Sequence, residues 1–570
     1  MLLRRLALLP RSGAAVRPQR NHPIVRFTAT TTTITTPIFY VNASPHLGHL
    51  HSSLMADALS RWFQFRNEPT LFTTGTDEHG LKVQQAADKA GKPTGQFCDD
   101  VAATFQAMCA SGDIRYDRFV RTTEPSHAVA VASMWRTLVE NDYIYLGEHE
   151  AYYCISDETF LTEMQVDTRD DGQIVSKESG HPVELVKEQN YKFRLSKLQD
   201  KLLAWLDDHP DVVQPPSRYN EVRATVERGL RDVSVSRLRE KIAWAIPVPD
   251  DDNHSVYVWL DALTNYLTCC KYPTDMAHFQ SCWPAAYHIV GKDILKFHAI
   301  YWPAFLLAAK LPLPRKIVAH AHWTVNGVKM SKSLGNVVTP DAIIEKFGLD
   351  AVRYYLLREG VLTDDGDFNE GMLKEHVNNE LADTLGNLGT QSRCMHLDSC
   401  CVGAVIRCTT LAFLPQGNVP SGGDFSPDDL ELIHRINDTV QQVQCHYERP
   451  DFALVTKTIM GLLYEVNRNF SKHEPWVVAK QLKTLAIDSE EAKVKRQLVD
   501  TTLLLSIEAV RVSALLLLPV VPSMSTGILN YLNVPTAERS FEFCRFGQST
   551  FGPVANQKSN VKFVPFRKLE

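Results

Sequence analysis

The sequence predicts an α/β protein built on a doubly wound parallel sheet, which is interrupted by an insertion and followed by a bundle of helices. Strand-like and helix-like apolar spacing alternates twice between residues 28 and 108. The same mixture resumes over residues 256–357, and strand signals are few beyond Asp367. Ligands bind such sheets at the carboxyl ends of the strands, so polar clusters at those ends are the candidate functional residues.

The first half of the sheet is expected near the start of the chain. Residues 28–41 are rich in Thr, Ile, Phe and Tyr, which favours a buried strand. Residues 47–66 then place apolar side chains on one face of a helix. A second short strand, 70–74, leads into a helical stretch over 81–108. This order of strands and helices predicts parallel pairing.

The middle of the chain has two turn signals that help to place its elements. Residues 140–240 are more polar and irregular, with a turn at Asp170–Gly172, and are expected to form an insertion. Residues 316–325 are strand-like and end at an Asn326–Gly327 turn.

Helices dominate the last third. One is expected to begin after Ser426 as its N-cap, and others at 451–470 and 496–518. The most apolar run, 503–521, carries Glu508 and Arg511, and two central charges favour a buried core helix over a membrane span.

Composition narrows the class of protein. The 570 residues predict two to four domains, and 44% hydrophobic and 22% charged residues exclude disordered, collagen-like and coiled-coil classes. Lys and Arg total 60 against 66 Asp and Glu, so a generally basic coat for nucleic acid is excluded. None of the twelve cysteines forms a Cys-x-x-Cys pair, which favours reduced, mostly buried thiols over a structural zinc site.

The first residues have the composition of a targeting segment. No Asp or Glu precedes Asp57, and the same stretch holds six arginines and no lysine. An Arg-rich, acid-free start is typical of an organellar import peptide, which we expect over residues 1–27. A disordered basic tail is the alternative. Leu6–Leu9 is too short for the apolar region of a secretory signal.

The first polar cluster follows the first strand. His46 and His49 surround Gly48 where a helix begins. A helix N-terminus offers unpaired N–H groups and partial positive charge, imidazoles donate hydrogen bonds, and glycine admits a nucleotide, so the cluster predicts a phosphate site. A zinc site built from His46, His49 and His51 is the alternative.

The second polar cluster is Lys329-Met330-Ser331-Lys332-Ser333, which follows the Asn326–Gly327 turn. Two lysines three residues apart in a Gly/Ser-rich loop can reach one triphosphate and neutralise the charge of a departing pyrophosphate. A solvated basic loop is the alternative for such a run taken by itself.

Together these clusters resemble the paired signatures of class I aminoacyl-tRNA synthetases. Four strings resemble the methionyl-tRNA synthetases within that class, and the resemblance extends from about residue 35 to about residue 525. The strings are TPIFYVN at 36–42, TGTDEHG at 74–80, VWLDAL at 258–263 and GKDI at 291–294. The insertion is too short for the editing domain of valyl, isoleucyl and leucyl enzymes, and the thiolate cluster of cysteinyl enzymes is missing.

The resemblance implies the function and the domains. It implies a methionine–tRNA ligase of the mitochondrial matrix that uses ATP with Mg²⁺ and charges tRNA(Met) with L-methionine. It also implies a monomer that binds no membrane. The single Cys154 resembles the zinc-free organellar branch, so no structural zinc is expected. The implied domains begin with a targeting peptide over 1–27. A Rossmann-like catalytic domain follows in two halves, 28–140 and 241–366, around a connective insertion over 141–240. A helical anticodon-binding domain covers 367–570.

The resemblance also implies the site residues, position by position. The catalytic residues are His46, His49, Lys329 and Lys332. The ATP-binding residues are His46, Gly48, His49, Gly291, Asp293, Lys329, Ser331 and Lys332. The methionine-binding residues are Ile38, Tyr40, Asp77, Trp259, Ala262, Leu263, Tyr266, His298 and Trp302. The anticodon residues are Trp476 and Asn387.

These residues also have alternative interpretations, some of them purely structural. Aromatics suit a thioether and Asp77 suits an ammonium group, but Trp259, Tyr266 and Trp302 are equally acceptable as core residues. Two rival interpretations are a different kind of nucleotidyltransferase and a non-catalytic relative that binds RNA. The helical tail of about 200 residues argues against the first, and the intact histidines and lysines argue against the second.

Overall fold

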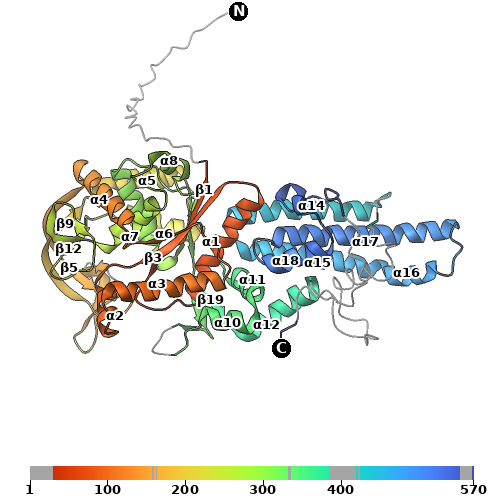
Figure 1. Ribbon diagram of the computed structural model, residues 1–570, viewed down its shortest axis with the longest axis horizontal. Helices are drawn as coiled ribbons and strands as arrows, with labels where there is room; N and C mark the ends of the chain where they lie inside the picture. Colours follow the sequence, from red (N-terminus) through yellow and green to blue (C-terminus); the bar gives the residue numbers. More distant parts are fainter. Residues whose placement is uncertain are drawn as a thin grey trace, which may run out of the picture.

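The computed structural model describes residues 30–156, 159–161, 163–330, 335–385, 419–420, 424–551 and 568–569. Figure 1 shows an α/β part that holds the sheets, with the long helices α14, α15 and α17 beside it. Helix α1 lies where the two parts meet.

A parallel sheet of seven strands forms the centre of the α/β part. Its order is β10-β16-β15-β1-β3-β2, with β4 also paired to β3, and every pairing is parallel. The strands are β1 (Thr32–Thr35), β2 (Phe39–Tyr40), β3 (Thr70–Asp77), β4 (Arg118–Arg121), β10 (Val213–Gln214), β15 (Tyr287–Gly291) and β16 (Ile317–His320). The chain builds outward from β1 in one direction through β3 and in the other through β15, which confirms the doubly wound class.

Helices connect and cover these strands. They are α1 (Leu47–Phe65), α2 (Leu81–Lys89), α3 (Thr94–Ser111), α4 (Pro125–Glu140), α7 (Val258–Thr268), α8 (Met276–Cys282), α9 (Trp302–Ala308), α10 (Pro340–Phe347) and α11 (Leu349–Glu359). Helix α1 confirms the prediction for 47–66.

Two predicted elements were each divided. The strand expected over 28–41 is β1 and β2, separated at Pro37, whose fixed ring and missing N–H interrupt a ladder. The helix expected over 81–108 is α2 and α3, because Gly91 turns at φ +65° and Pro93 follows. The second strand, expected over 70–74, continues to Asp77.

The segment predicted to be irregular holds an antiparallel sheet of order β11-β9-β5-β6. Its strands are β5 (Ile144–Cys154), β6 (Thr159–Leu161), β9 (Glu184–Phe193) and β11 (Val233–Ser234). The predicted turn at Asp170–Gly172 joins β7 (Val166–Thr168) to β8 (Ile174–Ser176), with Gly172 at φ +83°. Strand β10 also lies within 141–240 yet joins the main sheet, so this segment is not wholly separate from it.

Shorter elements complete the α/β part. Helices α5 (Gln199–Asp208) and α6 (Pro216–Glu227) precede a small sheet of β12 (Ser236–Leu238), β13 (Pro247–Val248) and β14 (Asp251–Val256). A further sheet contains β17 (Trp323–Val325), β18 (Val328–Lys329) and β19 (Gly366–Phe368). Asn326 and Gly327 join β17 to β18 with φ of 51° and 74°, which confirms the predicted turn.

The helical part confirms the expected helices. It contains α12 (Glu370–His376), η5 (Val377–Leu385), α14 (Pro427–Glu448), α15 (Phe452–His473), α16 (Pro475–Leu482), α17 (Glu490–Leu517) and α18 (Pro522–Tyr531). Ser426 caps α14 as predicted, since its Oγ accepts the Asp429 N–H at 3.3 Å. The Glu508 and Arg511 side chains are buried and paired at 2.8 Å, and the described residues contain no helix long and apolar enough to cross a membrane.

A buried ion pair joins the two parts of the molecule. Arg353 of α11 donates through Nη2 to Asp57 Oδ2 of α1 at 2.7 Å, and both side chains are completely buried. The same guanidinium donates to the carbonyl oxygens of Pro519 at 3.0 Å and Val520 at 2.9 Å, between α17 and α18. One side chain thereby connects α1 with the end of the bundle.

Replacing Arg353 with leucine is expected to lower the free energy of unfolding by about 3–5 kcal/mol, because the Asp57 carboxylate would remain buried without its partner. Urea denaturation followed by circular dichroism measures the change. Lys472→Ala, which removes an exposed ion pair with Asp428, is the control and should leave the midpoint unchanged. Equal effects of the two substitutions would contradict this account.

Candidate active site

The histidine cluster lies at the N-terminus of α1, beside the carboxyl end of the central strand β1. His46 is the N-cap, and its Nδ1 accepts the Gly48 N–H at 3.1 Å. His49 Nδ1 accepts the His46 N–H at 3.1 Å. The two rings stack with their centroids 3.8 Å apart. The helix start and both imidazoles thus form one unit.

These hydrogen bonds determine where the ring protons lie. Burial and the neighbouring His46 lower the pKa of His49 well below its usual value, so the ring is neutral near pH 7. Because Nδ1 of each ring accepts a backbone N–H, a neutral ring carries its proton on Nε2. Each imidazole can therefore donate one hydrogen bond through Nε2, as a phosphate oxygen requires.

Gly48 occupies a position where a side chain would crowd the His46 ring. A Cβ there would lie 3.0 Å from His46 Cε1 and 3.2 Å from His46 Nδ1. A larger residue would displace the ring whose Nδ1 caps the helix. Glycine therefore relieves the packing of His46 here, in addition to the access for a nucleotide that the sequence suggested.

The ends of β15 and β16 lie near this histidine unit. Gly291 ends β15, and a Cβ on it would lie 2.5 Å from Asp293 Oδ1. Asp293 Oδ1 pairs with His322 Nε2 at 3.1 Å. The next strand is tied to α1, since His320 Nε2 bonds Ser52 Oγ at 2.7 Å. The strand order reverses between β1 and β15, and ligands usually bind at such a point in this class of sheet.

The zinc alternative receives no support from the geometry. His51 packs edge-on against His320 and Trp323, with ring centroids 5.1 and 5.4 Å away, whereas His46 and His49 stack on each other. Throughout the described ranges, no three His, Cys, Asp or Glu side chains gather as metal ligands would.

The residues expected to line a methionine site come from α7, η4 (Phe297–Tyr301) and α9. Tyr266 O–H donates to His298 Nε2 at 2.7 Å, because His298 Nδ1–H is already donated to the Ile294 carbonyl at 2.9 Å. Burial lowers the pKa of His298 to about 4 and raises that of Tyr266. The pair is therefore uncharged near pH 7, which suits an uncharged thioether.

Aromatic packing surrounds this pair. The Tyr266 ring lies 5.9 Å from that of Trp302, which is fully buried. Trp259 stacks flat on Phe297 at 3.5 Å, and its indole Nε1 has no hydrogen-bond partner. Ala262 and Leu263 are buried on α7 and lie between Trp259 and Tyr266 in the sequence. All of these side chains except Ala262 belong to one hydrophobic cluster.

The strand side of the site carries the predicted carboxylate. Tyr40 of β2 pairs with Asp77 of β3, both at strand ends, and Ile38 is half-buried just before β2. Asp77 is 9% exposed. Tyr40 and Trp259 pack against the same small hydrophobic cluster, which brings β2 and α7 together.

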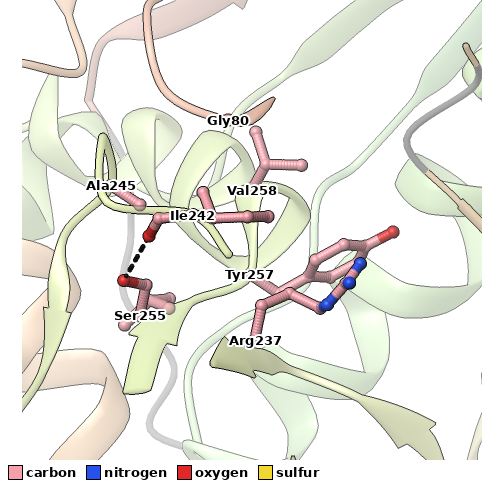
Figure 2. Close-up of a pocket in the computed structure, with 8 residues that line it drawn as sticks. Gly80, Arg237, Ile242, Ala245, Ser255, Tyr257 and Val258 are labelled. Atoms are coloured by element: carbon pink, nitrogen blue, oxygen red, sulfur yellow. Dashed lines mark hydrogen bonds between the residues drawn. The ribbon is translucent and has the colours of Figure 1, made fainter. Parts of the chain in front are cut away.

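A cavity lies beside this site. Figure 2 shows its lining by Gly80, at the start of α2, and by Tyr257 and Val258, at the start of α7, with Arg237 close by. The dashed bond joins Ser255 Oγ to the Ile242 carbonyl at 2.9 Å. None of the predicted methionine-binding residues lines this cavity.

Some predicted residues cannot be placed. Ser331, Lys332 and Asn387 lie outside the described residues, and only the backbone of Lys329 is described, in β18. Trp476 lies in the first turn of α16, half-buried against Phe470 with ring centroids 5.8 Å apart, so it is less exposed than the sequence suggested.

Comparisons with known proteins place the chain in a family. Residues 32–395 match the family described as tRNA synthetases class I (M). The chain is 42% identical over 513 residues to the mitochondrial methionine–tRNA ligase of Homo sapiens, covering 89% of this chain and 84% of that one. It is 40% identical to that of Xenopus laevis, covering 96% and 95%. This chain belongs to the class I methionyl-tRNA synthetases.

Solved structures agree with this family. A Mycobacterium tuberculosis methionyl-tRNA synthetase in complex with methionyl-adenylate superposes with a TM-score of 0.85 at 37% identity, covering 94% of this chain and 99% of that one. The family therefore accounts for the α/β part and the helical part together.

Sequence reasoning missed a polar network beside the residues that it predicted to bind methionine. His79 and His127 both bond Asp261, at 2.7 and 2.6 Å. Glu78 is fully buried and receives Arg121 at 2.7 Å. Two of the quoted strings contain His79 and Asp261, but residues 182 positions apart cannot be paired from one sequence.

His298 is expected to stay neutral, with its proton on Nδ1, from pH 8 down to pH 5.5, because its pKa is held near 4 and charging begins only as the pH falls toward that value. Imidazole ¹⁵N shifts of labelled protein measure this, with the signal assigned by its loss in His298→Asn. A histidine peptide titrating at about 6.5 is the control. A midpoint above 6 for His298 would disprove the burial effect.

Proposed function

We propose that this mitochondrial chain activates L-methionine with ATP to methionyl-adenylate and transfers the methionyl group to tRNA(Met). The observation that supports the proposal is that both groups lie beside strands of the same parallel sheet: the His49 ring contacts Phe39 of β2, and the Tyr266 ring, whose hydroxyl bonds His298, contacts His288 of β15. Membership of the methionyl-tRNA synthetases agrees with it.

We place ATP between the N-terminus of α1 and the end of β15. His46 and His49 would donate through Nε2 to phosphate oxygens, with the helix N-terminus adding partial positive charge. Gly48 lets the nucleotide approach, and Gly291 and Asp293 are positioned for the ribose. Lys329, Ser331 and Lys332 would neutralise the pyrophosphate as it departs.

Methionine is placed between Asp77 and the aromatic set. The Asp77 carboxylate would hold the α-ammonium group, while Trp259, Tyr266, His298 and Trp302 enclose the thioether with Ile38, Tyr40, Ala262 and Leu263. Contacts of sulfur with aromatic rings contribute about 0.3–1.5 kcal/mol each. The neutral Tyr266–His298 pair adds no charge that an apolar side chain would have to desolvate.

The reaction needs little proton chemistry. The methionine carboxylate is already ionised and attacks the α-phosphorus, forming a bond to it as the bond to pyrophosphate breaks. The terminal ribose of tRNA then takes the methionyl group and releases AMP. Catalysis is positioning and charge stabilisation. Mg²⁺ enters with ATP as part of the substrate, and no structural zinc is included, since Cys154 is the single cysteine of the insertion.

The remaining assignments concern the whole chain. Residues 1–27 direct it to the mitochondrial matrix, 28–140 and 241–366 form the catalytic domain around the 141–240 insertion, and 367–570 read the anticodon. Trp476 stacks on an anticodon base, and Asn387 contacts the anticodon. The chain acts as a monomer without a membrane partner.

Methionine-dependent ATP–pyrophosphate exchange tests this function. Protein lacking residues 1–26 is assayed with methionine and, in parallel, valine, isoleucine, leucine and cysteine. We expect exchange with methionine alone. Exchange with another amino acid would retain the reaction and overturn the proposed side-chain site. No exchange from folded protein would favour a non-catalytic RNA-binding relative.

His49→Ala and Lys332→Ala are each expected to reduce adenylate formation by ~10²-fold or more, because each removes a donor that stabilises charge on the departing phosphates. Methionine affinity, measured by calorimetry, should be nearly unchanged. His181→Ala removes an exposed histidine of the insertion and is the control. An equal loss of methionine affinity in either variant would contradict the assigned role.

Trp476→Ala should spare pyrophosphate exchange and weaken tRNA charging, since a lost base stack costs about 1–3 kcal/mol. Leu454→Ala is the matched control, because Leu454 is 41% exposed near the start of α15 whereas Trp476 follows the end of that helix. The rates of pyrophosphate exchange and of tRNA charging are compared in each variant. A loss of exchange in Trp476→Ala would contradict an anticodon role for Trp476.

A further inference from the structure

The loop that follows β3 is held in place by hydrogen bonds of the buried residue Glu78 and of its neighbour His79. Glu78 accepts hydrogen bonds from Thr76 Oγ1 at 2.7 Å and from Arg121 Nε at 2.7 Å, at the end of β4. Its backbone carbonyl accepts the Trp244 indole N–H at 2.6 Å. The next residue, His79, turns to the other side and bonds Asp261. Asp77 immediately precedes these two anchors.

Asp261 connects this loop with two helices. Its side chain is completely buried in the first turn of α7 and bonds His79 Nδ1 through Oδ2 at 2.7 Å. Its other oxygen, Oδ1, bonds His127 Nε2 at 2.6 Å, in the first turn of α4. Helix α4 packs beside α7, so one carboxylate joins three segments that are distant in the chain (Figure 1).

His127 extends the connection along α7. Its Nδ1 bonds Thr268 Oγ1 at 2.9 Å, in the last turn of that helix. Thr268 Oγ1 also lies 3.2 Å from the Thr264 carbonyl. The imidazole thereby contacts α7 near both of its ends, through Asp261 and Thr268, and fixes the position of the helix along its length.

The charge state strengthens this arrangement. Burial opposes ionisation of Asp261, but the two imidazoles outweigh it and lower its pKa to about 2. Burial also opposes a charge on His79, yet the Asp261 carboxylate raises the pKa of His79. A charged carboxylate with two ring N–H donors is bound more strongly than a neutral acceptor would be. The three groups hold their geometry as a unit.

The hydrogen bonds of Asp261 connect the two places where parts of methionine are proposed to bind. His79 is two residues from Asp77, where the methionine ammonium group is placed. On α7, Trp259 precedes Asp261 by two residues, and Ala262 and Leu263 follow it. The distance between the ammonium site and the side-chain site therefore depends on the contact between His79 and Asp261.

We propose that Asp261 is a positioning residue for methionine, and that it sets the spacing between Asp77 and α7 through His79 and His127. This inference rests on the proposed function. Asp261 does not touch the substrate in this account. It acts through the loop on one side and the helix on the other.

Asp261→Asn tests the proposal in the full chain. An amide keeps the shape and can accept from one ring, but its NH₂ faces the other ring nitrogen, so one contact must rearrange. Because a misplacement of about 1 Å can cost ~10²-fold, we expect the KM for methionine in exchange to rise about tenfold or more. The KM for ATP should change by less than about threefold, since α1 and β15 are not in the network.

Asp251→Asn is the matched control. Asp251 Oδ2 pairs with His254 Nδ1 at 2.8 Å on β14, so it is a second Asp–His pair that belongs to neither substrate site. Both KM values should be unchanged in this variant. Circular dichroism and the urea midpoint establish that each variant is folded.

Thr268→Val provides a second variant that leaves the carboxylate intact. It keeps the side-chain shape and removes the hydroxyl that His127 bonds, so the KM for methionine should rise about threefold, in line with the loss of about one hydrogen bond. If Asp261→Asn fails to fold, this variant decides the outcome. A rise in the methionine KM with an unchanged ATP KM supports the proposal.

Two results would overturn the inference. One is an unchanged methionine KM in folded Asp261→Asn, or in Thr268→Val if the first variant does not fold. The other is an equal rise in both KM values, as general loosening of the fold would give. In either case wild-type exchange with methionine leaves the proposed function standing, whereas wild-type protein without exchange removes the function and the inference together.

Discussion

The buried carboxylate of Asp57 is the constraint on which much of the structure depends. It lies in the middle of α1, the helix whose N-terminus carries His46 and His49, and it receives Arg61 at 2.7 Å as well as Arg353. A carboxylate without these partners could not remain charged in the interior. Because Arg353 also donates to two carbonyl oxygens at the end of the bundle, a shift of α1 relative to the bundle would break hydrogen bonds of this side chain.

The two halves of the candidate active site have opposite electrostatic characters. On the side proposed for ATP, the His46 and His49 imidazoles and a helix N-terminus offer hydrogen-bond donors for an anion. On the methionine side, Tyr266 and His298 satisfy each other and leave an uncharged wall. Asp77, at the end of β3, is the predicted carboxylate between them. The arrangement separates recognition of a charged group from recognition of an apolar one.

Local signals were predictable from the sequence, and long-range contacts were not. Helix α1, the Ser426 cap and the Asn326–Gly327 turn follow from spacing and turn chemistry within a few residues. The antiparallel pair of β5 and β9 was missed because β9 buries polar residues such as Glu188 and Asn190, which hides the alternation of apolar and polar residues. The resemblance supplied the methionine-lining residues, but the bond between His79 and Asp261 depends on how the sheet brings distant segments together, which one sequence does not encode in any local pattern.

Helix α17 is so long that a small change in its tilt would move its outer end by a large distance. Its 28 residues span about 42 Å, from Glu490 beside α16 to Leu517, two residues before the carbonyl oxygens that Arg353 holds. Tilting a rod of that length by about 5° moves its far end by about 4 Å, which is longer than a hydrogen bond. Because Arg353 holds the chain just beyond the inner end of α17, a change of helix angle at that end would move the outer end of the bundle by several times as much as the inner end.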